Sequence, residues 1–304
     1  MTTAKEIAVY CPAMSEDHQS TLQTLVVTVL AMTAFAANSI LCRLALGSSD
    51  VDAAGFTAIR LVSGAATLLA ISRLSGRQRT EQSRGDWVSG AALFIYAIMF
   101  SFAYLRLGVG TGALILFALV QATMIVWGLV RGERPRPFHW LGFAAAFSGL
   151  VYMVSPGLSA PSTAGSLMMG VAGIAWGIYS LRGRGTTDPV VTTTDNFVRS
   201  VPMVLVVAAV LYQTIDLSVR GVFLAVASGA IASGVGYVIW YAALRGLSAT
   251  RAASVQLTVP VIAAAGGLVF LQEAVSLRLA ISAALILGGV GLTLVGREKA
   301  TRRR

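Results

Sequence analysis

Residues 110–130 read GTGALILFALVQATMIVWGLV, an uninterrupted apolar stretch without a charged side chain. An α-helix of this length spans about 30 Å, which matches the hydrocarbon core of a lipid bilayer. Buried helices of soluble proteins generally contain shorter apolar runs. The stretch therefore predicts a transmembrane helix.

The same pattern recurs along the chain, which contains ten apolar stretches of about 18 or more residues. They are continuous runs rich in Ala, Leu and Gly, without the alternation of membrane β-strands, which argues against a closed β-barrel. We expect an all-α integral membrane protein with ten transmembrane helices. The predicted spans are 22–44, 53–74, 87–105, 110–130, 138–155, 165–181, 190–212, 221–244, 250–271 and 277–296.

The composition agrees with a lipid environment. The chain is 56% hydrophobic and 12% charged, whereas roughly a quarter of the residues of a soluble domain are charged. The net charge is +10, but the basic residues form short groups between apolar runs. We therefore expect a bilayer and no nucleic acid as the partner. Two cysteines, Cys11 and Cys42, suggest neither a disulfide framework nor a metal site.

The positions of lysine and arginine predict the orientation. Residues 1–20 are polar and mixed in charge, unlike a cleaved signal peptide, so we expect a cytoplasmic tail. With this end inside, 17 of the 23 basic residues fall on the cytoplasmic side and 4 on the other, and Arg60 and Arg199 lie within spans. The positive-inside rule then predicts a multi-pass membrane protein with both termini cytoplasmic.

The two halves of the chain show weak internal similarity. A shift of 140 residues places Glu133 on Glu273, and a shift of 139 places Arg60 on Arg199. Five spans per half is an odd number, so the halves enter the membrane from opposite sides and form two inverted five-helix repeats. The predicted organisation is a cytoplasmic tail at 1–20, repeats at 21–156 and 164–297, and a basic cytoplasmic tail at 298–304.

Several residues carry a family resemblance. They are Gly132-Glu133 and Gln272-Glu273 at the ends of corresponding helices, Pro260 in the ninth span, and Gly288, Gly289 and Gly291 in the last. With these features the chain, from residue 22 to 296, resembles the drug/metabolite transporter superfamily in its ten-helix branch with two EamA-type repeats. That pattern also places a proline in the fourth span, where this chain has Val120. Within that branch the chain looks like the bacterial amino-acid exporters, including the aromatic amino-acid exporters, and this resemblance implies a place in the bacterial inner membrane.

The resemblance implies an amino-acid substrate, which directs attention to the polar and aromatic side chains within spans. A zwitterionic amino acid requires hydrogen-bonding groups for its two ends and an apolar or aromatic wall for its side chain. Asparagine and glutamine that join helices, and tryptophan and tyrosine at the membrane interfaces, are the alternative interpretation. The candidate substrate-binding residues are Asn38, Tyr96, Gln121, Trp176, Tyr179, Tyr237, Trp240, Tyr241 and Gln256.

Three further residues are candidates for a gate or hinge. Pro260 leaves the carbonyl of Gln256 without its helical donor, so the ninth span is expected to bend there. Arg60 and Arg199 lie about two turns inside their spans, where an arginine must reach the interface or find a partner. Extension of the side chain to the interface is the simplest explanation, and a gate or a docking charge for a carboxylate is the alternative. Glu273, like its counterpart in the first half, is expected to cap a helix.

The sequence contains no nucleophile with its base, no metal-ligand cluster and no phosphate-binding loop, so we expect neither an enzyme nor a cofactor. The acidic residues lie in tails, loops or helix ends, whereas proton-driven antiporters hold an ionisable group in the pathway. We therefore expect a uniporter. The family resemblance implies that it exports aromatic and other neutral amino acids and related small metabolites by alternating access, and the presence of both repeats favours a monomer. A nucleotide-sugar or anionic-metabolite exchanger, a proton-coupled drug exporter and a membrane enzyme acting on lipids remain alternatives.

Overall fold

The computed structural model describes residues 16–77, 80, 83–132, 137–157, 160–183, 186–244, 247 and 255–301. Helices dominate these residues, and an isolated antiparallel bridge joins Val51 to Leu217. The elements are α1 (Glu16–Gly47), α2 (Ala53–Leu74), α3 (Trp87–Tyr104), α4 (Val109–Val130), α5 (Pro137–Val154), α6 (Thr163–Arg182), α7 (Pro189–Val210), η2 (Tyr212–Thr214), α8 (Val219–Val226), η3 (Ala227–Val235), α9 (Gly236–Leu244), α11 (Thr258–Leu271) and α12 (Leu277–Thr301).

Seven segments of the described chain are long and apolar enough to cross a membrane. They are Leu22–Gly47, Ala53–Leu74, Trp87–Tyr104, Val109–Val130, Thr163–Arg182, Pro189–Val210 and Val219–Leu244. Shorter apolar helices cover His139–Val154, Thr258–Leu271 and Leu277–Leu292. The prediction of an all-helical membrane protein is confirmed, whereas the number of ten spans stays a prediction.

Aspartates define where several helices begin. The Asp52 carboxylate accepts hydrogen bonds from two backbone N–H groups at the start of α2, and Asp188 does the same for α7. Pro189 follows directly at the first position of α7, where its missing N–H costs no intrahelical bond. Asp86 caps α3 through one such bond, from the backbone N–H of Ser89. Such side chains satisfy amide groups that a helix start leaves unpaired, so the boundaries follow from local sequence.

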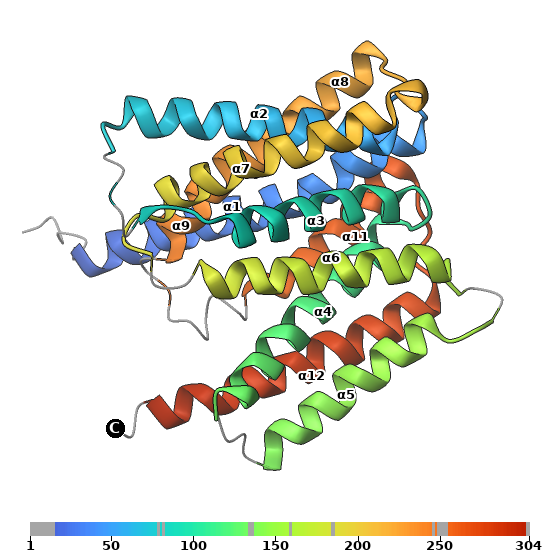
Figure 1. Cartoon of the computed structure of the whole chain (residues 1–304). Coiled ribbons are helices and arrows are strands. Elements are labelled where there is room, and N and C mark those ends of the chain that lie inside the picture. The colour runs from blue at the N-terminus through green and yellow to red at the C-terminus, as the bar shows by residue number, and fades with distance from the viewer. Residues whose placement is uncertain are drawn as a thin grey trace, which may run out of the picture.

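The packing of the helices is similar in the two halves of the chain. To compare them, we match α1 with α6, α2 with α7, α3 with the α8–η3–α9 segment, α4 with α11, and α5 with α12. In three cases a helix packs directly on its counterpart: α2 on α7, α4 on α11, and α5 on α12. Other contacts occur in both halves, with each helix replaced by its counterpart. The contact of α3 with α6 corresponds to that of α9 with α1, and the contact of α4 with α6 corresponds to that of α11 with α1. In Figure 1, α1 and α6 run in opposite directions, and α1 begins at the side of the bundle where α12 ends.

The segment α8–η3–α9 contains a π-helix in its middle. Residues 227–235 repeat Ala-Ser-Gly at an interval of five residues, and π-helices bond residues five apart. A Cβ at Gly229 would lie 2.2 Å from the Arg60 carbonyl oxygen and 2.1 Å from Ser63 Oγ. Glycine therefore lets this π-helix lie directly against α2, beside Arg60.

Pro260 lies close to the start of α11. Among the described residues, helical winding is interrupted at Leu257, and α11 begins at Thr258. Pro260 thus lies in the first turn of α11, directly after this interruption, and the expected bend of the ninth span stays a prediction. Its missing N–H is one of those without an intrahelical partner at any helix start, so no bond is lost. The predicted residues 250–254 lie outside the described chain.

Candidate functional site

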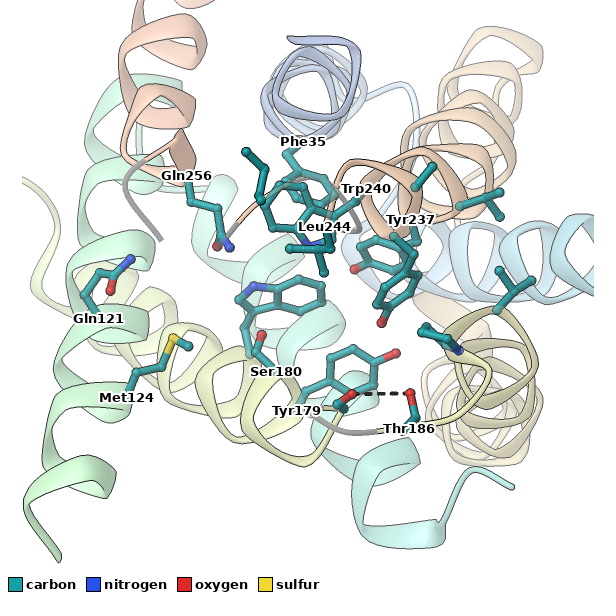
Figure 2. A pocket seen from close by; sticks show the side chains of 18 of the residues that line it. Phe35, Gln121, Met124, Tyr179, Ser180, Thr186, Tyr237, Trp240, Leu244 and Gln256 are labelled. Atoms are coloured by element: carbon teal, nitrogen blue, oxygen red, sulfur yellow. Dashed lines mark hydrogen bonds between the residues drawn. The ribbon is translucent and has the colours of Figure 1, made fainter. Parts of the chain in front are cut away.

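A cavity of about 560 Å³ lies within the bundle, between α1, α4, α6, α7, α9 and the start of α11 (Figure 2). This volume is within the range of small-molecule sites. The described residues that line it are Phe35, Arg77, Gln121, Met124, Trp176, Tyr179, Ser180, Gly183, Thr186, Pro189, Val190, Tyr237, Val238, Trp240, Tyr241, Ala242, Leu244, Leu247 and Gln256.

Aromatic rings form the central wall of the cavity. Trp176 stacks on Tyr179 and on Tyr237, with ring centroids 5.3 Å and 5.4 Å apart and interplanar angles of 27° and 21°. Phe35 meets Tyr237 and Trp240 edge-on, with centroids 5.8 Å apart in both pairs. Tyr237 and Trp240 lie three residues apart on one face of α9, as their spacing predicts. The wall offers ring faces and edges to an apolar or aromatic ligand.

Two amides border the cavity beside this wall. Gln121 projects from α4, where it is buried, and Gln256 lies just before α11 (Figure 2). Each amide carries both donors and an acceptor, so the pair is able to bind either end of a zwitterion. On α9, the hydroxyl of Tyr241 accepts a hydrogen bond of 3.1 Å from Thr193 on α7.

The cavity reaches one surface of the bundle. Its outer lining residues include Arg77 after the end of α2, Gly183 after the end of α6 and Pro189 at the start of α7. In Figure 1 these helix ends lie on the same side as the start of α1 and the end of α12. The cavity therefore faces the side on which both ends of the described chain lie.

At its inner end the cavity meets a second, much smaller void of about 20 Å³. Phe35, Trp176 and Tyr237 line both spaces, and we name these three residues the aromatic partition. Behind the partition, the void is bordered by Asn38, Ser39, Tyr96, Phe100, Leu116, Phe117, Ala232 and Ser233.

A buried polar network surrounds this void. Arg60 donates from Nη2 to the Tyr96 hydroxyl at 3.1 Å and from Nε to Ser233 Oγ at 3.3 Å. Asn38 Nδ2 donates to the same Tyr96 hydroxyl at 3.3 Å, and Ser228 donates to the Asn38 amide oxygen. The network joins α1, α2 and α3 to the π-helix η3, because both serines lie on that segment.

Arg60 does not extend to a membrane interface. Only 2% of its surface is exposed, and its guanidinium carbon lies 5.2 Å from the Tyr96 ring centroid and 5.1 Å from that of Phe100. These contacts are cation–π interactions. The interface explanation for Arg60 is therefore wrong, because the side chain turns toward partners inside the bundle.

Arg199, the repeat-related arginine, has a different environment. Its guanidinium donates to the Asp195 carbonyl at 3.1 Å and lies 3.4 Å from the Asp195 carboxylate one turn earlier in α7. The buried Asp195 carboxylate also accepts a hydrogen bond from Gly85 N at 3.1 Å. Arg199 lines neither space, and its charge is already paired.

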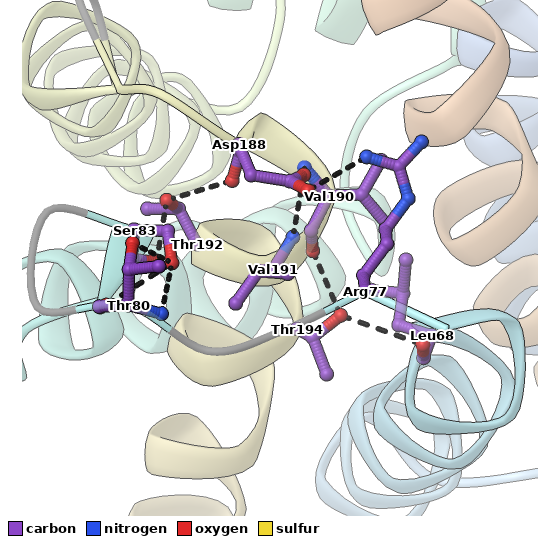
Figure 3. A network of polar contacts seen from close by, with 9 residues as sticks. All are labelled: Leu68, Arg77, Thr80, Ser83, Asp188, Val190, Val191, Thr192 and Thr194. Atoms are coloured by element: carbon purple, nitrogen blue, oxygen red, sulfur yellow. Dashed lines mark hydrogen bonds and ion pairs between the residues drawn. The ribbon is translucent and has the colours of Figure 1, made fainter. Parts of the chain in front are cut away.

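Polar contacts tie the α2–α3 connection to the start of α7 near the cavity opening (Figure 3). Arg77 Nη1 lies 2.7 Å from Asp188 Oδ2, and Thr192 Oγ1 donates to the Ser83 carbonyl at 2.9 Å. Burial acts to raise the pKa of the Asp188 carboxyl, but hydrogen bonds from Arg77 and two backbone amides, with the Arg77 charge, lower this pKa overall.

A second tie closes the opposite side of the bundle. Arg43, near the end of α1, donates to Glu273 at 3.2 Å and to the Tyr104 carbonyl at 3.0 Å. Glu273 Oε2 accepts from Val109 N, the first residue of α4, at 2.7 Å. The prediction that Glu273 caps a helix is confirmed, and its counterpart Glu133 lies outside the described residues.

The structure gathers the predicted binding residues around the two adjoining spaces. Gln121, Trp176, Tyr179, Tyr237, Trp240, Tyr241 and Gln256 line the cavity, and Asn38 and Tyr96 line the void. The three gate or hinge candidates, Pro260, Arg199 and Arg60, line neither space, although Arg60 donates hydrogen bonds to Tyr96 and Ser233 on the border of the void. Sequence reasoning missed Phe35, although it lies three residues before Asn38 and therefore near the same face of α1. It also missed Ser233, which only the π-helix turns toward Arg60.

Comparisons with known proteins place the chain among transporters. The model of the EamA-like transporter family matches residues 22–155 and again residues 163–295. An uncharacterized protein of Pseudomonas aeruginosa is 46% identical over 275 residues, which cover 90% of this chain and 96% of the relative. An uncharacterized transporter of Archaeoglobus fulgidus is 29% identical over 230 residues, which cover 68% and 73%. One crystal structure shares the fold with a TM-score of 0.62 and 21% identity, over 89% of this chain and 97% of the solved chain.

Proposed function

This chain belongs to the EamA-like transporter family and is a multi-pass membrane transporter, and on that premise we propose that it exports neutral amino acids, aromatic ones included, and related small metabolites. The observation that carries the proposal is the cavity, in which a wall of aromatic rings adjoins the amides of Gln121 and Gln256. The rings suit an apolar side chain, and the amides suit the ammonium and carboxylate ends.

Uniport is the mode of transport that the lining favours. No aspartate, glutamate or histidine is among the described residues that line the cavity. A proton-coupled drug exporter would need such a group to exchange charge with its substrate. An exchanger of anionic metabolites would need several cations, and Arg77 is the one cation in the described lining, where Asp188 pairs with it.

Alternating access is the mechanism that follows from the packing. We propose ten crossings in two inverted repeats, 21–156 and 164–297, because the helix pairs exchange under the match of one half with the other. The excess of lysine and arginine on the side that holds the termini supports a cytoplasmic location for that side. The cavity then faces the cytoplasm, while the aromatic partition and the Arg43–Glu273 tie close the other side. The transporter acts as a monomer in the bacterial inner membrane, without a cofactor.

The test is flux through purified protein in lipid vesicles. Labelled phenylalanine and serine are each offered with and without an imposed pH gradient, and vesicles without protein provide the background. Saturable flux that is indifferent to the gradient is expected. Absence of flux for both amino acids overturns the substrate assignment, whereas flux that depends on the gradient overturns uniport.

A further inference from the structure

Arg60 carries a guanidinium nitrogen that the protein leaves unused. Nε and Nη2 donate to Ser233 and Tyr96, but Nη1 is buried and has no hydrogen-bond partner in the described chain. Among the described residues, no carboxylate forms an ion pair with Arg60 either. Cation–π contacts with Tyr96 and Phe100 offset only part of the desolvation of a buried cation. An anion at Nη1 would supply the missing partner.

Arg60 does not itself line the small void, but two of its hydrogen-bond partners do. Tyr96 and Ser233, which both accept hydrogen bonds from Arg60, line the void together with Asn38. Its volume of about 20 Å³ is sufficient for a group of roughly the size of a water molecule but not for a whole metabolite. Hydrogen bonds from arginine to carboxylates are charge-assisted and strong, and Nη1 is the nitrogen that is left to donate one. The chemistry around the void therefore suits one end of a carboxylic acid.

The aromatic partition separates this position from the open cavity. The Trp176 ring contacts Tyr96 on the side of the void, with centroids 4.8 Å apart, and stacks on Tyr179 on the side of the cavity. A change in the position of Trp176 would thus join the two spaces. A substrate with its side chain among the rings could then extend its carboxylate toward Arg60.

We propose that Arg60 binds the carboxylate of the substrate in the state in which the aromatic partition has opened, so that transport selects molecules that carry a carboxylate. The inference rests on the proposed amino-acid transport and assigns the residue that selects this substrate class. Arg199 does not share the role, because Asp195 already pairs with its charge.

The first experiment uses the wild-type protein in vesicles. Labelled phenylalanine is offered with excess tyrosine, phenylalanine amide or phenethylamine as competitor; the last two lack the carboxylate. Inhibition by tyrosine alone is expected. Equal inhibition by all three overturns the role of Arg60 and leaves the proposed function standing, whereas absence of phenylalanine and serine flux is a failure of the proposed function itself.

The second experiment changes the cation. Arg60→Gln should reduce the phenylalanine kcat/KM by about thirtyfold or more, the usual effect of removing one partner from a buried charge pair. Arg60→Lys retains the charge, so its kcat/KM for phenylalanine should fall less. Arg199→Gln is the matched control and should still select substrates that carry a carboxylate. Ligand-induced thermal stabilisation by phenylalanine reports binding independently of flux, and it should disappear in Arg60→Gln. The proposal would be overturned if phenylalanine stabilised both Arg60 variants as much as the wild type and both variants still selected substrates with a carboxylate.

Discussion

Arg60 Nη2 lies 3.1 Å from the hydroxyl oxygen of Tyr96, in the buried interior of a helical membrane bundle. The hydroxyl accepts a second hydrogen bond from Asn38, so one phenol oxygen connects α1, α2 and α3. Behind the aromatic partition, this oxygen holds in place the guanidinium that we propose as the carboxylate site.

Tyr96→Phe should therefore destabilise the protein and impair transport. Loss of the hydroxyl leaves buried donors on Arg60 and Asn38 without an acceptor, which lowers the free energy of unfolding by about 1–3 kcal/mol. Thermal unfolding in detergent measures the loss of stability, and phenylalanine flux measures its consequence. Tyr152→Phe, at a half-exposed position on α5, is the control and should behave as wild type; equal melting temperatures for the two variants would contradict the network.

Trp176→Ala should weaken the binding of aromatic substrates. The substitution removes the ring that stacks on Tyr179 and Tyr237, so the KM for phenylalanine should rise by about tenfold while that for serine changes less. Concentration-dependent flux measures both constants. Trp140→Ala, on the exposed face of α5, is the control and should leave both KM values unchanged. An unaltered phenylalanine KM in Trp176→Ala would show that the substrate does not contact the aromatic partition.

Glu273→Gln should favour opening on the side opposite the cavity. The substitution breaks the ion pair with Arg43, which is about three-quarters buried, and a loss of about 1 kcal/mol shifts a two-state equilibrium roughly fivefold. In a Cys11→Ser background, faster labelling of the buried Cys42 by an impermeant maleimide should report the opening. Arg43→Gln should increase the labelling rate in the same way, and the double variant should be labelled little faster than either single variant. Fully additive effects would show that Arg43 and Glu273 do not act through their ion pair.

Gly229→Ala should destabilise the contact between the π-helix and α2. The new methyl group would lie within 2.2 Å of the Arg60 carbonyl oxygen, and overpacking of this kind costs about 1–3 kcal/mol. Gly288→Ala is the matched control, because nothing lies within 4 Å of its added Cβ, and it should be neutral or slightly stabilising. Melting temperatures compare the two; a neutral Gly229→Ala would show that the two helices separate readily.

The tie between Arg77 and Asp188 should persist throughout the physiological pH range. The pKa of Asp188 is lowered below its ordinary value of 3.8, so its contribution is complete above that value and is lost as the pH falls through the lowered pKa. Asp188→Asn keeps a capping oxygen but removes the charge. Its melting temperature should lie below that of wild type by a constant amount from about pH 5 to 8, and the gap should narrow below about pH 4. If this difference in melting temperature changed between pH 5 and 8, a group other than the Asp188 carboxyl would be responsible for the stabilisation.

Much of the candidate site followed from a simple argument about polarity. A polar side chain in an apolar span is expensive to expose to lipid, so it tends to turn inward. The nine predicted residues accordingly surround the cavity and its adjoining void. The same argument does not apply to Phe35, since an aromatic ring is equally stable against lipid, and only its contacts with Trp176 and Tyr237 place it in the partition.

The amino-acid sequence by itself determined that the chain is helical and crosses a membrane, because the length of an apolar run and the capping of a helix are local properties. Only the tertiary structure decided that Arg60 lies buried with an unused nitrogen while its repeat-related partner Arg199 pairs with Asp195. It also decided that Pro260 lies in the first turn of α11 and that Trp176 lines both the cavity and the void. These features depend on which helices meet, and the distance between side chains on different helices is set by packing across the bundle.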